Sequence, residues 1–269
     1  MPAPVTGFIH SLNLCGVSPW AIASPHFNRA PRPLRIQGVR RGHRHLFARL
    51  LSETDPLRRG RIFHDYVDVA FQLHHWRDES SASGRLSLKN SYLRFLRGWM
   101  VDSNSVEGAV LKGWVESRLG LPPTYHREPI RGRHSEAYFR YTLDRMRGHA
   151  RTSAIQSQLD LLFEFVQYEL SRRAGSSTHD TLYRGVNDLS EHEILEDLGR
   201  GRLLVRLNNL NSFTWDFERA WEFGSRVLEA RVPIVKVFFR SDLLPVPVLN
   251  GEQEVLVIGG EYEVHVRTF

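Results

Sequence analysis

Two glutamates one residue apart, Glu252 and Glu254, open an apolar, β-branched run near the carboxyl end of the chain. The run, Val255-Leu256-Val257-Ile258, is typical of a strand. Because successive strand side chains point to opposite faces, the pattern places both carboxylates on one face. Paired carboxylates on one face suit acid and base chemistry or the stabilisation of a cation. An isolated pair of this kind more often marks the solvated edge of a strand, so the pair has to be weighed with its neighbours.

Two other motifs precede the glutamates, Tyr183-Arg184-Gly185 and Ser212-Phe213-Thr214. In the order Arg, Ser-x-Thr, Glu-x-Glu, the three motifs resemble the Arg-Ser-Glu group of mono-ADP-ribosyltransferases. These enzymes split NAD⁺ and transfer its ADP-ribose to a protein. The resemblance covers roughly the last third of the chain, and three motifs in the right order are much more specific than any one of them.

The resemblance implies a role for each acid. Cleavage of the bond between nicotinamide and ribose creates positive charge on the ribose, so a preorganised carboxylate is the main catalytic requirement. Glu254 matches the catalytic glutamate of the family, and Ser212 matches the serine that orients it. Glu252 matches the first acid, which orients the acceptor guanidinium in arginine-specific members and helps to take up its proton. Because the first acid is commonly Gln in members with other acceptors, Glu252 favours an arginine acceptor.

The remaining motif residues are predicted to bind NAD⁺. The planar, permanently charged fork of Arg184 suits the NAD⁺ phosphates, although a structural ion pair is the alternative. By resemblance Tyr183, Gly185 and Thr214 flank the same site, with Thr214 also supporting the fold. The aromatic side chains with the right chemistry to stack on nicotinamide or adenine, each of which has packing in the core as its alternative role, are Tyr183, Phe217, Trp221 and Phe223.

A second Glu-x-Glu, formed by Glu261 and Glu263, follows the first. We prefer Glu252 and Glu254 as the site because a loop precedes them and a buried run follows, as in the family. The pair Gly259-Gly260 is expected to form a turn before a last strand over 262–266.

Longer segments resemble a narrower family. The stretches 63–74, 90–99 and 132–138, together with Gln167-Tyr168-Glu169, are similar to the dinitrogenase reductase ADP-ribosyltransferases of nitrogen-fixing bacteria. This resemblance spans most of the chain. It implies NAD⁺ as substrate and no required metal, and one arginine of dinitrogenase reductase, the nitrogenase iron protein, as acceptor. It also implies that nitrogenase is switched off reversibly when ammonium appears or energy falls, with a PII signalling protein as regulator.

Composition limits the other classes. At 269 residues the chain can bury a full core, and no run approaches the roughly 18 apolar residues of a membrane span. The start lacks the features of a signal peptide, and Cys15 is the only cysteine, so a cytoplasmic protein is expected. His64 and Asp68 are one helical turn apart, but no third metal ligand is positioned beside them.

The net charge of +6 is unevenly distributed, because the segment from residue 29 to residue 61 contains ten arginines and only two acidic residues, Glu53 and Asp55. Attraction to an acidic protein is one reading, in which Arg40, Arg41, Arg44 and Arg49 contact the iron protein or PII. A solvated face is equally consistent. No recognised nucleic-acid motif accompanies the arginines, so nucleic acid is not the expected partner. The competing classes are an arginine-specific transferase with another target, a non-catalytic NAD-binding module and a basic nucleic-acid-binding protein.

The predicted fold is α+β, with a helix-rich region over 1–174 and a catalytic core over 175–269, possible as one continuous domain. Residues 1–38 are expected to be mainly irregular because of their prolines. Apolar spacing predicts helices over 42–52, 63–76, 88–100, 106–119, 135–147 and 153–172, and a capping box at Leu189 to Ile194 predicts a helix between the first two motifs. The family resemblance implies a split, mostly antiparallel β-sheet core with NAD⁺ between its two sheets.

Overall fold

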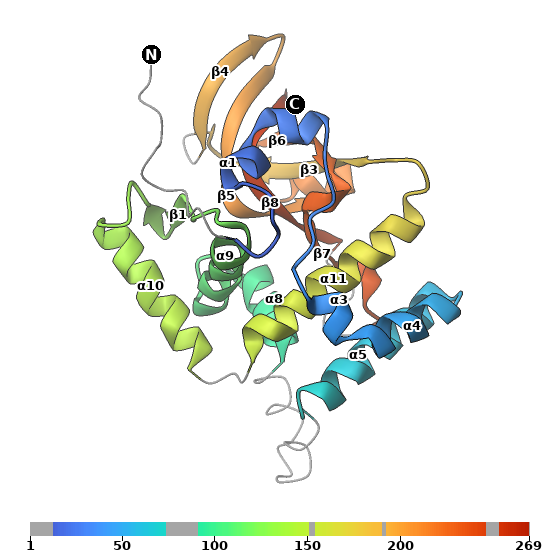
Figure 1. The fold of residues 1–269 in the computed structure, drawn as a ribbon. Coiled ribbons are helices and arrows are strands. Elements are labelled where there is room, and N and C mark those ends of the chain that lie inside the picture. Colours follow the sequence, from blue (N-terminus) through green and yellow to red (C-terminus); the bar gives the residue numbers. More distant parts are fainter. Residues whose placement is uncertain (1–12, 74–90, 151–153, 190–191, 246–252, 269) are drawn as a thin grey trace.

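The fold places most of its helices before a six-stranded antiparallel sheet, as Figure 1 shows, and a second, two-stranded sheet lies among the helices in the sequence. The computed structural model describes residues 13–73, 91–150, 154–189, 192–245 and 253–268. In the described ranges the helices are α1 (Pro19–Ala23), α2 (Pro25–Arg29), α3 (Val39–Gly42), α4 (Arg44–Ser52), α5 (Pro56–Ala70), α8 (Tyr92–Val101), α9 (Val106–Leu119), α10 (Glu136–His149), α11 (Ile155–Arg173) and α12 (Phe217–Trp221), with short 3₁₀ turns η2 (Ile234–Lys236) and η3 (Ser241–Leu243). The strands are β1 (Tyr125–His126), β2 (Glu128–Pro129), β3 (His179–Val186), β4 (Glu193–Gly199), β5 (Arg202–Thr214), β6 (Arg226–Pro233), β7 (Val237–Arg240) and β8 (Glu254–Thr268). The predicted α+β class is therefore confirmed.

The main sheet is organised around its two longest strands. Its six strands follow the order β4-β5-β3-β6-β8-β7, and every pairing is antiparallel. Strand β5 also pairs with β8, from Arg202 opposite His265 to Thr214 opposite Glu254. Because β3 pairs with both β5 and β6, and β8 also pairs with both, these four strands form a closed ring of pairings.

Capping residues define both ends of α9. The hydroxyl of Ser105 accepts a hydrogen bond from the amide of Gly108 at 3.0 Å and starts α9. Gly120 ends the same helix in the left-handed conformation, at φ 75°. The boundaries of α4, α8, α9, α10 and α11 agree with prediction to within a few residues.

The expectation of irregular structure at the start of the chain is partly wrong. Pro19 and Pro25 occupy the first positions of α1 and α2, where a missing N–H costs nothing. For the same reason α5 begins at Pro56, capped by Asp55, and not at residue 63.

The predicted helix after Leu189 is also wrong. From Glu193 the chain forms β4, whose register with β5 begins at Glu193 opposite Arg206. The turn Gly199-Arg200-Gly201 has positive φ at all three residues, which favours a tight reversal between strands. Pairing with β5 therefore overrides the local capping signal.

Gly259 and Gly260 do not form the predicted turn, because β8 runs through them without interruption. The register between β5 and β8 shifts between Leu207 and Leu210, directly across from these glycines. A Cβ on Gly259 would lie 1.6 Å from the carbonyl oxygen of Asn208. The glycines therefore make room for a bulge in β5.

The helical part and the sheet share one hydrophobic core, although the predicted boundary near residue 175 separates them in the sequence. Phe63, Phe165 and Trp114 from the helices belong to the same buried cluster as Phe238 and Leu256 from the sheet. Helix α11 packs beside β7, at the edge of the sheet (Figure 1), and the side-chain amide of Gln167 donates to the carbonyl oxygen of Val237 at 2.7 Å.

A buried ion pair fastens α5 to α11. Two of the three guanidinium nitrogens of Arg59 donate to the carboxylate of Glu169, Nε at 2.6 Å and Nη2 at 2.8 Å. The two side chains are only 3% and 2% exposed. Removal of one partner therefore leaves an uncompensated buried charge.

We expect Arg59→Met to lower the free energy of unfolding by about 3–5 kcal/mol, because Glu169 loses its buried partner. The control is Arg58→Met, which removes an exposed pair with Asp55 and should cost less than about 1 kcal/mol. Urea unfolding of both variants measures the difference. Equal effects of the two substitutions would show that the Arg59 pair is not a main fastening of α5.

Candidate active site

Three of the predicted site residues meet across neighbouring strands. Arg184 on β3 donates from Nη1 to the backbone carbonyl oxygen of Ser212 on β5 at 2.9 Å. The hydroxyl of Ser212 donates to Oε1 of Glu254 on β8 at 2.6 Å. A short bond from a hydroxyl to a carboxylate is charge-assisted. The structure thus connects the arginine, the serine and the second glutamate in one chain of contacts.

The strand register explains why Ser212 reaches Glu254. Ser212 lies opposite Leu256, and Thr214 lies opposite Glu254. Residues two apart share a face, so Ser212 and Glu254 are diagonal neighbours on the same face of the sheet. The amide of Glu254 also donates to the hydroxyl of Ser241 at 3.1 Å, which holds the first residue of β8 in place.

Glu252 lies outside the described residues, so its side chain stays a prediction. Strand β8 begins at Glu254 and not at Glu252. Gln253, between the two glutamates, has a φ of 45°, in the left-handed region that residues with a side chain rarely occupy. The simple alternation that was predicted to put both carboxylates on one face therefore does not extend through Gln253.

Trp99 also belongs to this group, and no motif in the sequence points to it. The indole Nε1 of Trp99, on α8, donates to the hydroxyl of Ser212 at 2.8 Å. Trp99 is 3% exposed and lies within the helix predicted over 88–100. Because the contact joins residues 113 positions apart, no local pattern could have revealed it.

Arg184 lowers the pKa of two buried neighbours. Lys112 on α9 is buried, and burial lowers its pKa to about 7, with Asp102 raising the pKa and Arg184 lowering it further. Burial, followed by the charge of Arg184, lowers the pKa of the buried His192 to about 4, so this imidazole is neutral at pH 7. Such a surrounding favours a bound anion, because an anion offsets the positive potential.

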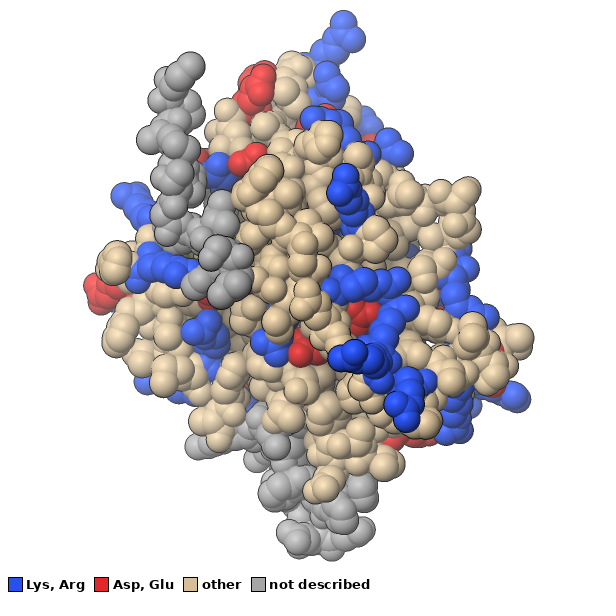
Figure 2. Space-filling model, in the orientation of Figure 1, with Lys and Arg blue, Asp and Glu red and all other residues tan. Residues whose placement is uncertain are grey.

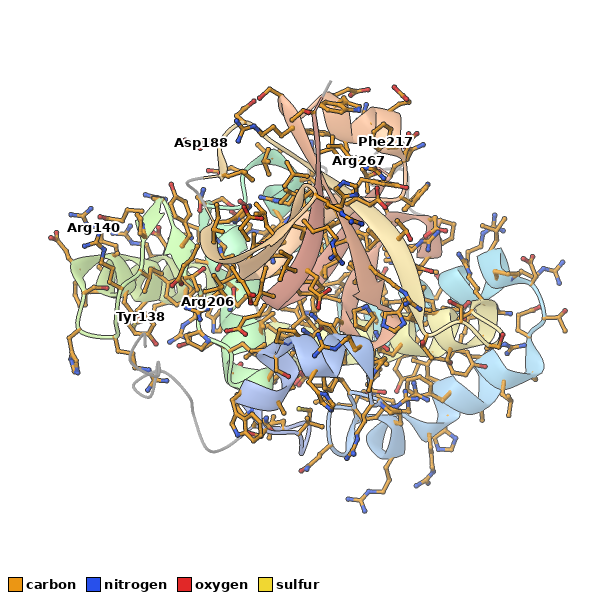
Figure 3. All side chains as sticks on the ribbon, turned by 90° about the horizontal axis from the view of Figure 1, so that it is seen from above. Tyr138, Arg140, Asp188, Arg206, Phe217 and Arg267 are labelled. Atoms are coloured by element: carbon orange, nitrogen blue, oxygen red, sulfur yellow. The ribbon has the colours of Figure 1, made fainter. Side chains whose placement is uncertain are left out.

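Half-buried aromatic rings cluster where β3 meets α12. The ring of Tyr183 packs edge-on against Phe217 with centroids 5.2 Å apart, and Phe217 packs on Trp221 at 5.8 Å. Phe223 is 60% exposed. These four candidate stacking residues lie outside the hydrophobic core, so packing in the core is not their role. Figure 3 shows Phe217 on the sheet side of the molecule, away from Tyr138 and Arg140 on α10.

Gly185 and Thr214 have clear local roles. A Cβ on Gly185 would lie 2.0 Å from the carbonyl oxygen of Ala220, so only glycine lets α12 approach β3. The hydroxyl of Thr214 accepts a hydrogen bond from the amide of Asp216 at 3.1 Å and supports the turn into α12.

The second Glu-x-Glu pair is occupied by ion pairs. Glu261 binds Arg206 at 3.0 Å, and Glu263 binds Arg29 at 2.8 Å. Figure 3 shows Arg206 on the sheet, apart from Phe217. Both acids are therefore engaged with arginines other than Arg184.

His64 contacts Tyr92, with Nδ1 and the hydroxyl oxygen 3.3 Å apart. Across the part of the chain that the structure describes, no three His, Cys, Asp or Glu side chains come together as a metal-holding group. Within the same described ranges, no helix has both the length and the apolar character to cross a membrane.

The structure thus joins the fork of Arg184, the hydroxyl of Ser212 and the carboxylate of Glu254 across three strands. This is the arrangement expected of an ADP-ribosyltransferase of the Arg-Ser-Glu group. The family model "Dinitrogenase reductase ADP-ribosyltransferase (DRAT)" matches residues 12–266, and the chain therefore belongs to this family. The predicted resemblance is confirmed, and with it NAD⁺ as the substrate of the enzyme.

A similar curated protein is the NAD(+)–dinitrogen-reductase ADP-D-ribosyltransferase of Rhodospirillum rubrum. It is 43% identical over 264 residues, which cover 96% of this chain and 95% of that protein. No solved structure matches the chain.

We expect Glu254→Gln to lower the rate of NAD⁺ cleavage at least about 100-fold, because the neutral amide cannot stabilise positive charge on the ribose. Glu263→Gln is the matched control. It removes only an exposed ion pair with Arg29 and should leave the rate within about twofold of wild type. Labelled-NAD⁺ turnover and thermal unfolding are measured for both variants. A larger loss from Glu263→Gln would shift the site to the second pair.

Proposed function

We propose that this protein transfers ADP-ribose from NAD⁺ to an arginine of dinitrogenase reductase and thereby inactivates nitrogenase reversibly. The observation that carries this proposal is the family match over residues 12–266, together with 43% identity to an enzyme whose name states this reaction. The connected Arg184, Ser212 and Glu254 supply the chemistry such an enzyme needs.

In the proposed reaction, the bond between C1′ of the ribose and the nicotinamide nitrogen breaks, and nicotinamide leaves with the bonding electrons. Glu254 stabilises the positive charge that develops on the ribose, and Ser212 holds the carboxylate in position. A guanidinium nitrogen of the acceptor then bonds to C1′ and loses a proton. Glu252 takes up that proton, which matters because a guanidinium is otherwise a poor nucleophile.

We place the NAD⁺ phosphates near Arg184. Its guanidinium is held by the carbonyl oxygen of Ser212, and its positive charge helps to lower the pKa of the buried Lys112 nearby. A pyrophosphate would offset the charge of Arg184. The half-buried rings of Tyr183, Phe217 and Trp221 would then flank the nicotinamide or adenine.

We also propose that the core is split in the manner of the family, with NAD⁺ bound where two groups of strands separate. Support comes from the junction of β3 with β5, which consists of one register pair, Tyr183 opposite Thr214. The three site residues lie beside that junction.

We further propose that the protein acts in the cytoplasm and that a PII signalling protein regulates it.

The arginine-rich segment divides into internal and exposed residues, which narrows the proposed docking surface. Arg40 donates to Oε2 of the buried Glu164 at 2.6 Å, and Arg35 binds the same oxygen at 3.3 Å. Arg41, Arg44 and Arg49 on α3 and α4 are exposed. Figure 2 shows Lys and Arg side chains gathered over this part of the molecule. We propose that these three exposed residues, without Arg40, contact an acidic face of the iron protein or PII.

The first experiment tests the reaction itself. Purified protein is incubated with labelled NAD⁺ and purified dinitrogenase reductase, in parallel with the Glu254→Gln variant. We expect label on the iron protein with wild type alone. Cleavage of NAD⁺ without labelling would keep the chemistry and reject the target. A lack of both, with PII present, would favour a non-catalytic NAD-binding module, and salt-sensitive binding to random DNA would favour a nucleic-acid-binding protein.

A triple substitution tests the docking surface. Changing Arg41, Arg44 and Arg49 to Gln should lower kcat/KM for dinitrogenase reductase about 10-fold at low salt, because electrostatic steering is lost. Cleavage of NAD⁺ in water should stay unchanged. The charge-matched control replaces the exposed Arg131, Arg200 and Arg231 with Gln. If kcat/KM for dinitrogenase reductase falls equally in both triple variants, the surface of α3 and α4 has no special role in docking.

A further inference from the structure

The hydrogen-bond chemistry of an indole fixes the direction of the contacts at Ser212. A serine hydroxyl can donate one hydrogen bond and accept others, whereas an indole N–H can only donate. Trp99 Nε1 lies 2.8 Å from the Ser212 hydroxyl oxygen. Ser212 must therefore accept from Trp99, and its single hydrogen is left to point at Oε1 of Glu254, 2.6 Å away.

The indole that imposes this direction is held firmly. Trp99 is 3% exposed and belongs to the hydrophobic core. The ammonium nitrogen of Lys112 lies 5.8 Å from the centroid of its ring. Lys112 is in turn held by hydrogen bonds to Oδ1 of Asn104 at 3.1 Å and to the carbonyl oxygen of Tyr125 at 3.0 Å. Trp99 therefore presents its N–H from a fixed position.

We propose that Trp99 is a positioning residue for ADP-ribosyl transfer, which fixes the Ser212 hydroxyl as a donor and thereby holds the Glu254 carboxylate toward the ribose. This inference rests on the proposed function. The helical part of the chain thus completes the catalytic group of the sheet. Without the indole N–H, the Ser212 hydroxyl is free to rotate, and the carboxylate loses part of its preorganisation.

The expected effect is on the chemical step. Trp99→Phe should lower kcat about 10- to 100-fold, the range typical when an outer partner that orients a functional group is removed. The KM for NAD⁺ should change less than about threefold, since Trp99→Phe removes the hydrogen bond to Ser212 but keeps an aromatic ring beside Lys112.

The matched control is Trp114→Phe. Trp114 is fully buried, and its indole Nε1 donates to Oδ1 of Asp160 at 2.7 Å, so this variant also loses a buried indole hydrogen bond. The indole hydrogen bond of Trp114 thus goes to Asp160 and not to Ser212. We expect Trp114→Phe to lower thermal stability while kcat, measured where both variants are folded, stays within about threefold of wild type.

A double-mutant cycle links the effect to Ser212. NAD⁺ cleavage is measured for Trp99→Phe, Ser212→Ala and the double variant, and Trp99→Phe should have little further effect once the hydroxyl is absent. Full additivity, or a kcat loss no greater than that of Trp114→Phe, overturns the proposal while the proposed function stands. Inactive wild type would overturn both. If Trp99→Phe does not fold, the sulfur isostere of tryptophan at position 99 removes the N–H and keeps the ring shape.

Discussion

The hydrogen bond between Ser212 and Glu254 depends on one register, that of β5 against β8. A slip by one residue would turn the Ser212 side chain to the opposite face and break the contact. The register is fixed by the bulge in β5 facing Gly259 and by Asn209, whose side-chain amide donates to the carbonyl oxygens of Lys112 and Leu121, both at 2.9 Å. The bulge thus attaches β5 to α9, and the geometry of the site follows from that attachment.

The same attachment explains why the helical part matters for chemistry. Helix α9 supplies Lys112 to the surroundings of Arg184, and α8 supplies Trp99 to Ser212. The shared hydrophobic core keeps these helices and the sheet in one rigid relation. The prediction placed a boundary near residue 175, where helices give way to strands. The contacts of Lys112 and Trp99 cross that boundary, so the two parts of the chain contribute to one site.

Sequence patterns revealed what depends on local order and missed what depends on long-range pairing. Caps such as Ser105 and Gly120 placed a helix, and the order of three motifs brought Arg184, Ser212 and Glu254 under consideration. The helix predicted after Leu189 became β4 because its partner strand overrode a local signal. Ser241 and Trp99 carried no motif, since their importance comes only from the residues that the fold brings beside them.

The arginine-rich segment shows why net charge alone cannot identify a partner. Arg59 and Arg40 neutralise Glu169 and Glu164, two carboxylates buried in α11 that lie more than a hundred positions away in the sequence. The amide of Ile36 also donates to Glu164, at 2.7 Å. These arginines serve folding, because a buried carboxylate without a partner is strongly destabilising. Only the exposed arginines present their charge to another molecule. A charged surface therefore has to be defined after the arginines in internal ion pairs, such as Arg40 and Arg59, have been set aside.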